Sequence, residues 1–252
     1  MTAEEMNEPM LLDPDNDTDT VNNINTNTNI ISLQKDILFL LTPKTSIEYA
    51  ITVIQFLFAL SIYCSFYNLE NDLLKTHIFG MTIAFVLLLP QGVLTAHRFR
   101  TIQNNDLRRV RAIFIHALIQ IGGLISFASA FMAIYENKNK NKKEHFTTAH
   151  SKFGGMTLVL ALTAFSLGAI GFNRTGIART MKMTLEQVKQ TKTQHRNVGN
   201  MVVALSFMTI TLAFHHPAIA GYVLKYVVTF FYIAMFCLFF FFALHTRGGY
   251  VR

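Results

Sequence analysis

Six windows of about 18 to 22 residues in this sequence carry no charge or almost none, so each is long enough to cross a bilayer as a helix. They lie near residues 47–66, 77–97, 112–134, 152–172, 197–216 and 222–245. The chain is 51% hydrophobic and only 15% charged, which is too apolar for an ordinary soluble domain. The sequence therefore predicts an all-α membrane protein with six transmembrane helices.

Two segments precede the predicted membrane domain. Residues 1–29 are acidic and rich in Asn and Thr, a composition typical of a disordered tail. In residues 30–42 the apolar side chains recur on one helical face, which favours an amphipathic helix at the membrane surface. The membrane domain is expected to occupy residues 43–252, with its core at 75–216.

The 22 Lys and Arg residues outnumber the 15 Asp and Glu residues, which gives a net charge of +7. Most of these Lys and Arg residues lie in the connections between windows. Such residues set membrane orientation, so no nucleic-acid partner is needed to explain them. With six spans both termini share one side, and that side carries about twice as many Lys and Arg as the other. The positive-inside bias therefore predicts cytosolic termini, and the Lys-rich run at 138–143 is the segment that opposes it.

Four histidines stand at or near the starts of four consecutive windows: His77, His116, His150 and His195. Ionisable residues inside a bilayer are rare and mark functional sites. In the predicted topology, His77 and His150 lie near the non-cytosolic face, whereas His116 and His195 lie near the cytosolic face. The sequence therefore predicts two histidine pairs, one near each face.

Neutral imidazole is a ligand for iron, copper and zinc. A structural zinc site needs four converging ligands, commonly thiolates or carboxylates, and neither pair has such companions. Haem fits better, because its porphyrin supplies four nitrogens and two histidines on facing helices supply the axial positions. Bis-histidine ligation leaves the iron no open position and favours one-electron transfer. Glycines follow each histidine, where they either flank a flat macrocycle or allow close helix packing: Gly80, Gly122, Gly123, Gly154, Gly155 and Gly199.

These features resemble the cytochrome b561 family of transmembrane, ascorbate-linked reductases. The resemblance covers about Lys75 to His216. It rests on the four histidines, the pair His150–Ser151 and the stretch LTAHRFRTIQNNDLRRVRAIFIHALIQ, where a basic connection leads to a histidine followed by Leu and Gln. It implies a four-helix core with two b-type haems, held by His77 with His150 and by His116 with His195. The chain is similar to family members that consist of little more than the membrane domain.

The resemblance also implies an oxidoreductase that carries electrons from cytosolic ascorbate, or a similar anionic reductant, to monodehydroascorbate or a ferric chelate on the other side. Candidate contacts to these anions are Arg98, Arg100 and Arg109 on the cytosolic side and Lys152 beside His150, although membrane anchoring explains the arginines equally well. The chain departs from the family where AHRFR replaces a Tyr-Arg-containing segment and where Lys152 replaces an aromatic residue. These changes leave haem ligation intact and the electron donor open. We expect an endomembrane (vesicle or vacuole) or plasma-membrane location, and we consider a homodimer.

Two other functions stay open at this point. A transporter or scaffold would use the histidines as proton relays or interhelical hydrogen bonds. A quinol-linked dihaem cytochrome b would take its electrons from a different donor. The remaining histidines near the membrane ends, His97, His145, His215 and His216, are interpreted as loop or interface residues; the alternatives are a competing ligand for the first two and an acceptor contact for the last two.

Overall fold

The computed structural model describes residues 45–100, 107–172 and 176–216, together with the isolated residues 34, 35, 38 and 233. The side chains of residues 98–100 and 107–108 are not described. The predicted tail, most of the predicted interfacial helix and the sixth predicted span lie outside the described residues.

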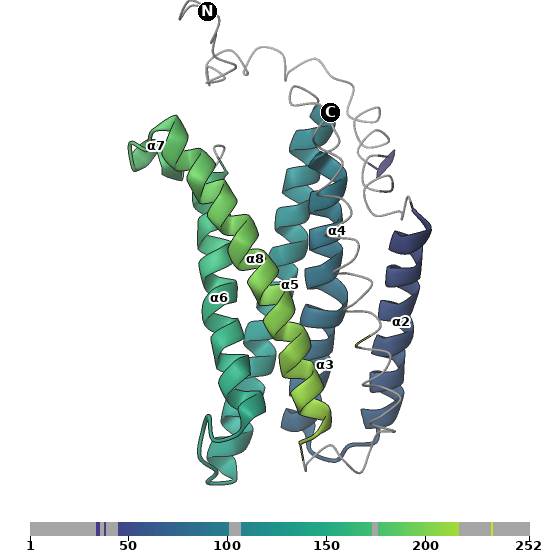
Figure 1. The fold of residues 1–252 in the computed structure, drawn as a ribbon. Helices are drawn as coiled ribbons and strands as arrows, with labels where there is room; N and C mark the ends of the chain where they lie inside the picture. The colour runs from purple at the N-terminus through teal and green to yellow at the C-terminus, as the bar shows by residue number, and fades with distance from the viewer. Residues whose placement is uncertain are drawn as a thin grey trace, which may run out of the picture. The chain divides into compact units, whose positions relative to one another are not determined.

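Every regular element in this described part is a helix, which confirms the predicted all-α class. Four helices are long: α2 (Ser46–Phe66), α5 (Leu107–Lys140), α6 (Ala149–Gly171) and α8 (Leu185–Phe214). The short helix α7 (Ile177–Thr180) precedes α8 (Figure 1). A fifth apolar segment is divided into α3 (Asp72–Thr82), the π-helix η3 (Ile83–Leu88) and α4 (Leu89–Arg100). All five segments are long and apolar enough to span a membrane, as the first five windows predicted.

The helices α5 and α8 continue well beyond their predicted windows. The window 112–134 becomes Leu107–Lys140, and the window 197–216 belongs to a helix that already begins at Leu185. A hydropathy window marks the part of a helix that crosses the hydrocarbon of the bilayer. A helix pairs its own backbone hydrogen-bonding groups in water as well as in lipid. The polar ends of both helices therefore stay helical outside the apolar windows.

Side-chain caps determine where several of these helices begin. Thr45, Asn71, Thr148 and Thr184 each accept a hydrogen bond from a backbone N–H in the first turn of the helix that follows. At α6 and α8 the cap is a full capping box, in which a side chain of the first turn bonds back to the cap residue. These caps satisfy backbone donors that the start of a helix otherwise leaves unpaired.

The second span widens into the π-helix η3 shortly before Pro90. Proline has no backbone N–H, so it breaks the regular ladder of a transmembrane helix. At the end of η3 the Leu89 N–H bonds the Ala84 carbonyl, five residues back instead of four. Single π turns of this kind lie mostly inside α-helices and often at functional sites.

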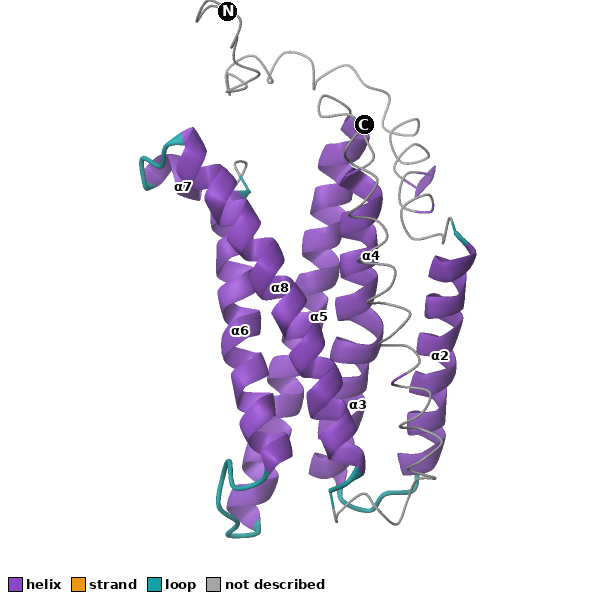
Figure 2. Cartoon of the chain, in the orientation of Figure 1, coloured by secondary structure: helices purple, strands orange, loops and turns teal. Residues whose placement is uncertain are grey.

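Two hairpins of packed helices make up the core. In the first, α3, η3 and α4 run along α5; in the second, α6 runs along α8 (Figures 1 and 2). In Figure 1, α3 and α6 begin at the lower end, and α5 and α8 begin at the upper end. The hairpins meet through an apolar layer that contains Phe85, Phe127, Ala164 and Val202. The two phenylalanine rings there make an edge-to-face contact with centroids 4.7 Å apart.

The helix α2 packs on the outside of this core. Its buried residues Ile51, Phe58 and Ile62 belong to one apolar cluster with Val86 of η3 and Phe207 of α8. Because the cluster joins α2 to elements of both hairpins, α2 covers the seam where they meet.

Candidate functional site

The structure brings the four predicted histidines together as two pairs. The rings of His77 on α3 and His150 on α6 have centroids 6.3 Å apart, with an interplanar angle of 82°. The rings of His116 on α5 and His195 on α8 have centroids 6.2 Å apart, at 85°. Each pair therefore joins one histidine of the first hairpin to one of the second, as the topology argument predicted.

Each histidine is held by a backbone carbonyl of its own hairpin. In the first hairpin, His77 Nδ1 donates to Ala130 O at 3.0 Å and His116 Nδ1 donates to Gly92 O at 2.8 Å. These bonds fix the ring orientation and place the proton on Nδ1, so the lone pair lies on Nε2.

The second hairpin repeats the arrangement. His150 Nδ1 donates to Thr209 O at 2.9 Å, and His195 Nδ1 donates to Ala164 O at 2.8 Å. A carbonyl acceptor behind a ligating imidazole is the usual means by which proteins orient a metal-binding histidine and raise its basicity.

On three of the four helical segments of the core, the histidine and the carbonyl that accepts from a neighbouring helix's histidine are separated by the same number of residues. His116 and Ala130 are 14 residues apart on α5, His150 and Ala164 on α6, and His195 and Thr209 on α8. Fourteen residues are close to four helical turns, so both groups face the same side, about 21 Å apart along the axis.

On the remaining segment, α3–η3–α4, His77 and Gly92 are 15 residues apart, and the π-helix η3 lies between them. A π turn holds one more residue than an α turn. The widened turn thus absorbs the extra residue and keeps Gly92 in register with His77.

The separation of the rings fits two axial ligands of one metal. A metal–imidazole bond is about 2 Å long, and the ring centroid lies roughly 1 Å behind the ligating nitrogen, so two imidazoles on one iron have centroids about 6 Å apart. The observed 6.3 and 6.2 Å match this value. Within the described ranges, no cluster of three or more His, Cys, Asp or Glu is present that would hold a metal without such a macrocycle.

The glycines that follow the histidines divide between the two roles considered from the sequence. A Cβ at Gly80 would lie 2.8 Å from Ala130 Cβ, and at Gly155 it would lie 3.0 Å from the ring of Phe146, so both serve close packing. Gly122 and Gly123 likewise face Leu88, and Gly154 faces Thr209 at 3.6 Å. Gly199, one turn after His195, has no atom within 4 Å of its Cβ position in the described structure, which leaves room for a flat group.

The predicted anion-binding residues lie on three helices, α4, α5 and α6. Arg98 and Arg100 lie on α4 with side chains outside the described set, and Arg109 on α5 is near enough to Lys192 for their charges to interact. Lys152 is exposed on α6, and a residue two positions from His150 does not share its helical face. Two lysines of the run at 138–143 lie at this end of the bundle: the charge of Lys138 acts on both His150 and His216, and that of Lys143 acts on His216.

The ring of His216 is in contact with the His77/His150 pair, its centroid 6.4 Å from that of His150. Burial lowers the pKa of His216, and repulsion from Lys138 and Lys143 lowers it further. His145 instead stacks on Tyr135 and bonds Asn139 Oδ1 at 2.9 Å. This places His145 in the connection before α6, in agreement with its interpretation as a loop residue.

Sequence reasoning missed the residues that hold the histidines. Their contribution is a main-chain carbonyl, which any residue type supplies, so the one available signal was a small residue where a ring approaches the helix. Gly168 is the clearest example: a Cβ there would lie 3.0 Å from His195 Cε1 and 3.1 Å from its Nδ1, so the absence of a side chain lets the ring reach α6.

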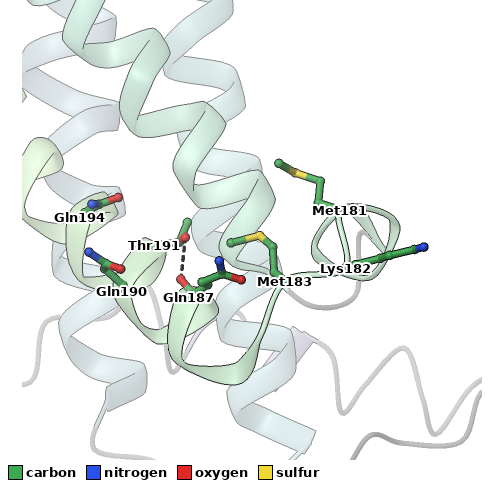
Figure 3. Close-up of a pocket in the computed structure, with 7 residues that line it drawn as sticks. All are labelled: Met181, Lys182, Met183, Gln187, Gln190, Thr191 and Gln194. Carbon is green, nitrogen blue, oxygen red and sulfur yellow. Dashed lines mark hydrogen bonds between the residues drawn. The ribbon is translucent and has the colours of Figure 1, made fainter.

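A shallow hollow lies where the turn after α7 meets the first turns of α8 (Figure 3). Its lining includes Met181, Lys182, Gln187 and Gln190. The Thr191 hydroxyl donates to the Gln187 carbonyl within α8. The hollow contains no His, Cys, Asp or Glu side chain among its lining residues, so it offers no set of metal ligands.

Comparison with known families matches residues 76–221 to eukaryotic cytochrome b561. A search of curated proteins found no match to the chain. The matched segment spans more than half of the sequence and contains all four paired histidines. Members of this family bind b-type haem and use it to transfer electrons across a membrane. From the match, and from two histidine pairs with the geometry of axial ligands, we conclude that the chain is a member of the eukaryotic cytochrome b561 family.

Proposed function

We propose that this chain holds two b-type haems and transfers electrons through them from a cytosolic, ascorbate-like reductant to monodehydroascorbate or a ferric chelate on the opposite side. The observation that carries the proposal is the doubled pair geometry, with both ring separations near 6 Å and all four Nδ1 atoms bonded to carbonyls. When bound, such haems accept and release single electrons.

The residues of the chain have three tasks in this function. His116 and His195 hold the group nearer the proposed cytosolic face, and His77 and His150 hold the other. The acceptor carbonyls keep each Nε2 lone pair aimed between the hairpins. Between the pairs, the layer containing Phe85 and Phe127 is apolar, which excludes water from the middle of the bundle.

Positive charge near the His77/His150 pair supports an anionic acceptor at this end of the bundle. Lys138 and Lys143 lie close enough to His216 for their positive charges to lower its pKa, so two cationic side chains stand beside this residue. An anionic chelate or oxidised ascorbate would be attracted there. We place this end on the non-cytosolic side from the distribution of Lys and Arg in the sequence.

The visible spectrum and haem content of the purified protein test the proposal. We expect low-spin bands that ascorbate reduces and two haems per chain. His116→Ala should abolish reduction from the cytosolic side, whereas His77→Ala should leave the first reduction intact and block delivery to a ferric chelate. His145→Ala is the matched control, since this histidine bonds Asn139 outside both pairs.

Colourless folded protein would contradict the proposal and leave a transporter or scaffold as the alternative. One haem per chain would contradict the two-site arrangement. Faster reduction by a quinol than by ascorbate would retain the haem sites and replace the proposed donor.

A further inference from the structure

Side-chain amides clamp the α4 segment that orients His116, and one of these clamps comes from α2. Gln91 Nε2 donates to Gln55 Oε1 at 2.7 Å and to Thr52 Oγ1 at 3.2 Å, both on α2. The next residue along the chain is Gly92, whose carbonyl accepts the His116 Nδ1 proton. The outer helix α2 is thus connected to a ligand of the His116/His195 pair through two adjacent residues of α4.

A second clamp comes from α5. Gln120 lies one turn after His116, and its Nε2 approaches the Leu89 carbonyl at 3.4 Å. The same amide covers Gly92 so closely that a Cβ there would overlap the nitrogen and lie 2.9 Å from Cδ. The segment 89–92 is therefore held from both sides, by α2 through Gln91 and by α5 through Gln120.

The position of this segment explains why it needs external support. It follows directly on the π-helix η3 and contains Pro90, which donates no backbone hydrogen bond. The acceptors of the other three histidines, Ala130, Ala164 and Thr209, lie inside uninterrupted α-helices.

The buried amide of Gln55 lowers the stability of the fold. Its side chain is almost fully buried, at 1% exposure, and its Nε2 has no hydrogen-bond partner among the described residues. An unpaired buried donor destabilises a protein, and an apolar side chain of the same length would avoid that cost. Stability alone therefore does not account for an amide here, whereas its role as acceptor for Gln91 does.

We infer that Gln91, together with Gln55 and Gln120, positions His116 and thereby sets the reduction potential of the haem at the His116/His195 pair. This rests on the proposed two-haem function. A firm Nδ1–H···O=C bond makes the imidazole a stronger electron donor, which stabilises the oxidised iron. Loosening the clamp weakens that bond and raises the potential of this haem, with no change at the His77/His150 pair.

Potentiometric titration of the full-length protein tests the inference, with the low-spin EPR signals recorded on the same samples. Gln91→Met keeps the length of the side chain and removes its donors. We expect the reduction equilibrium of one haem to shift about tenfold toward the reduced state, which is roughly 59 mV for a one-electron couple. Gln55→Met, which leaves the bond to Thr52, should shift the same haem in the same direction by less.

The matched control is Gln190→Met, the same exchange at an exposed position on α8. A compensating pair sharpens the result. Gly92→Ala alone forces the Gln120 amide away and should perturb the EPR signal of the His116/His195 haem, whereas Gly92→Ala with Gln120→Ala should restore it toward that of Gln120→Ala alone.

The outcomes separate this inference from the proposed function. If the unaltered protein binds no haem, the proposed function fails. If it binds two haems and both Gln→Met variants leave both potentials unchanged, the clamp does not position His116. Equal shifts at both haems, or unfolding of both variants without selective loss of one haem, would mean that the amides only support the fold.

Discussion

Removing a single residue from the π-helix should leave both histidine pairs intact, although the same deletion in a regular span should not. On α5, α6 and α8 the ligand and the acceptor carbonyl are 14 residues apart, and on α3–η3–α4 they are 15 apart. If η3 exists to absorb one residue, deletion of Ile83 converts the span to a regular α-helix with the common spacing. Ile83 is 44% exposed, so its side chain contributes little to the core.

The magnitude follows from helix geometry. Deleting one residue from an α-helix turns everything beyond it by about 100° and shifts it by about 1.5 Å. Deletion of Val159, which is 62% exposed on α6, should therefore swing either His150 or the Ala164 carbonyl out of position. Loss of such an orienting contact typically reduces metal affinity about 10- to 100-fold.

Haem content per chain, measured as the pyridine haemochrome of purified protein, distinguishes the two deletions. We expect two haems after deletion of Ile83 and selective loss of one after deletion of Val159. A further variant combines deletion of Ile83 with Pro90→Ala. The alanine restores a backbone donor, so this variant shows whether proline strain in the regular helix causes any loss of haem. The reasoning is refuted if deletion of Ile83, with or without Pro90→Ala, loses as much haem as deletion of Val159.

Three glycine substitutions give further predictions. In Gly168→Ala the new Cβ would push the His195 ring by roughly 0.5 Å to reach an ordinary contact of about 3.5 Å, so haem affinity at this pair should fall about tenfold, as a haem titration would show. In Gly80→Ala the methyl would lie 2.8 Å from Ala130 Cβ, so α3 must move away from α5 and EPR should show loss of the His77/His150 signal alone. Gly199→Ala meets no atom within 4 Å in the described structure, so reduced haem content without reduced thermal stability of the haem-free protein would show that the cofactor lies there.

Gly122→Ala is the control for all three substitutions, because its Cβ would meet Leu88 Cδ1 at an ordinary 3.7 Å. Alanine also favours a helix over glycine by about 1 kcal/mol, and this variant reports that gain alone. If Gly168→Ala and Gly80→Ala bind as much haem as Gly122→Ala, the contacts to His195 and Ala130 do not govern the sites.

Much of the arrangement could be predicted from the sequence because a bilayer limits what a chain can do. Five apolar windows became five long helical segments, since backbone groups in lipid must be satisfied within the helix. The alternation of spans also predicted which histidines meet: His77 with His150 and His116 with His195. An even or odd number of crossings decides the end of the bundle at which a residue lies, whatever the packing.

Other expectations depended on which side chains neighbouring helices bring together. Lys152 was expected as an anion contact beside His150; it is exposed on α6, two residues along the chain from His150, and this contact stays a prediction. Sequence distance along a helix gives the depth of a residue but not the neighbour that a different helix brings to it.

The sequence by itself determined the five long apolar segments of the described part and the end of the bundle at which each of the four imidazoles lies. Only the tertiary structure decided what holds those imidazoles, because their partners are backbone carbonyls of neighbouring helices and carry no residue-type signature. The role of the π-helix was likewise decided only by the tertiary structure. Its extra residue has meaning only relative to the 14-residue spacing of the helices packed around it, and that register exists once the two hairpins are assembled.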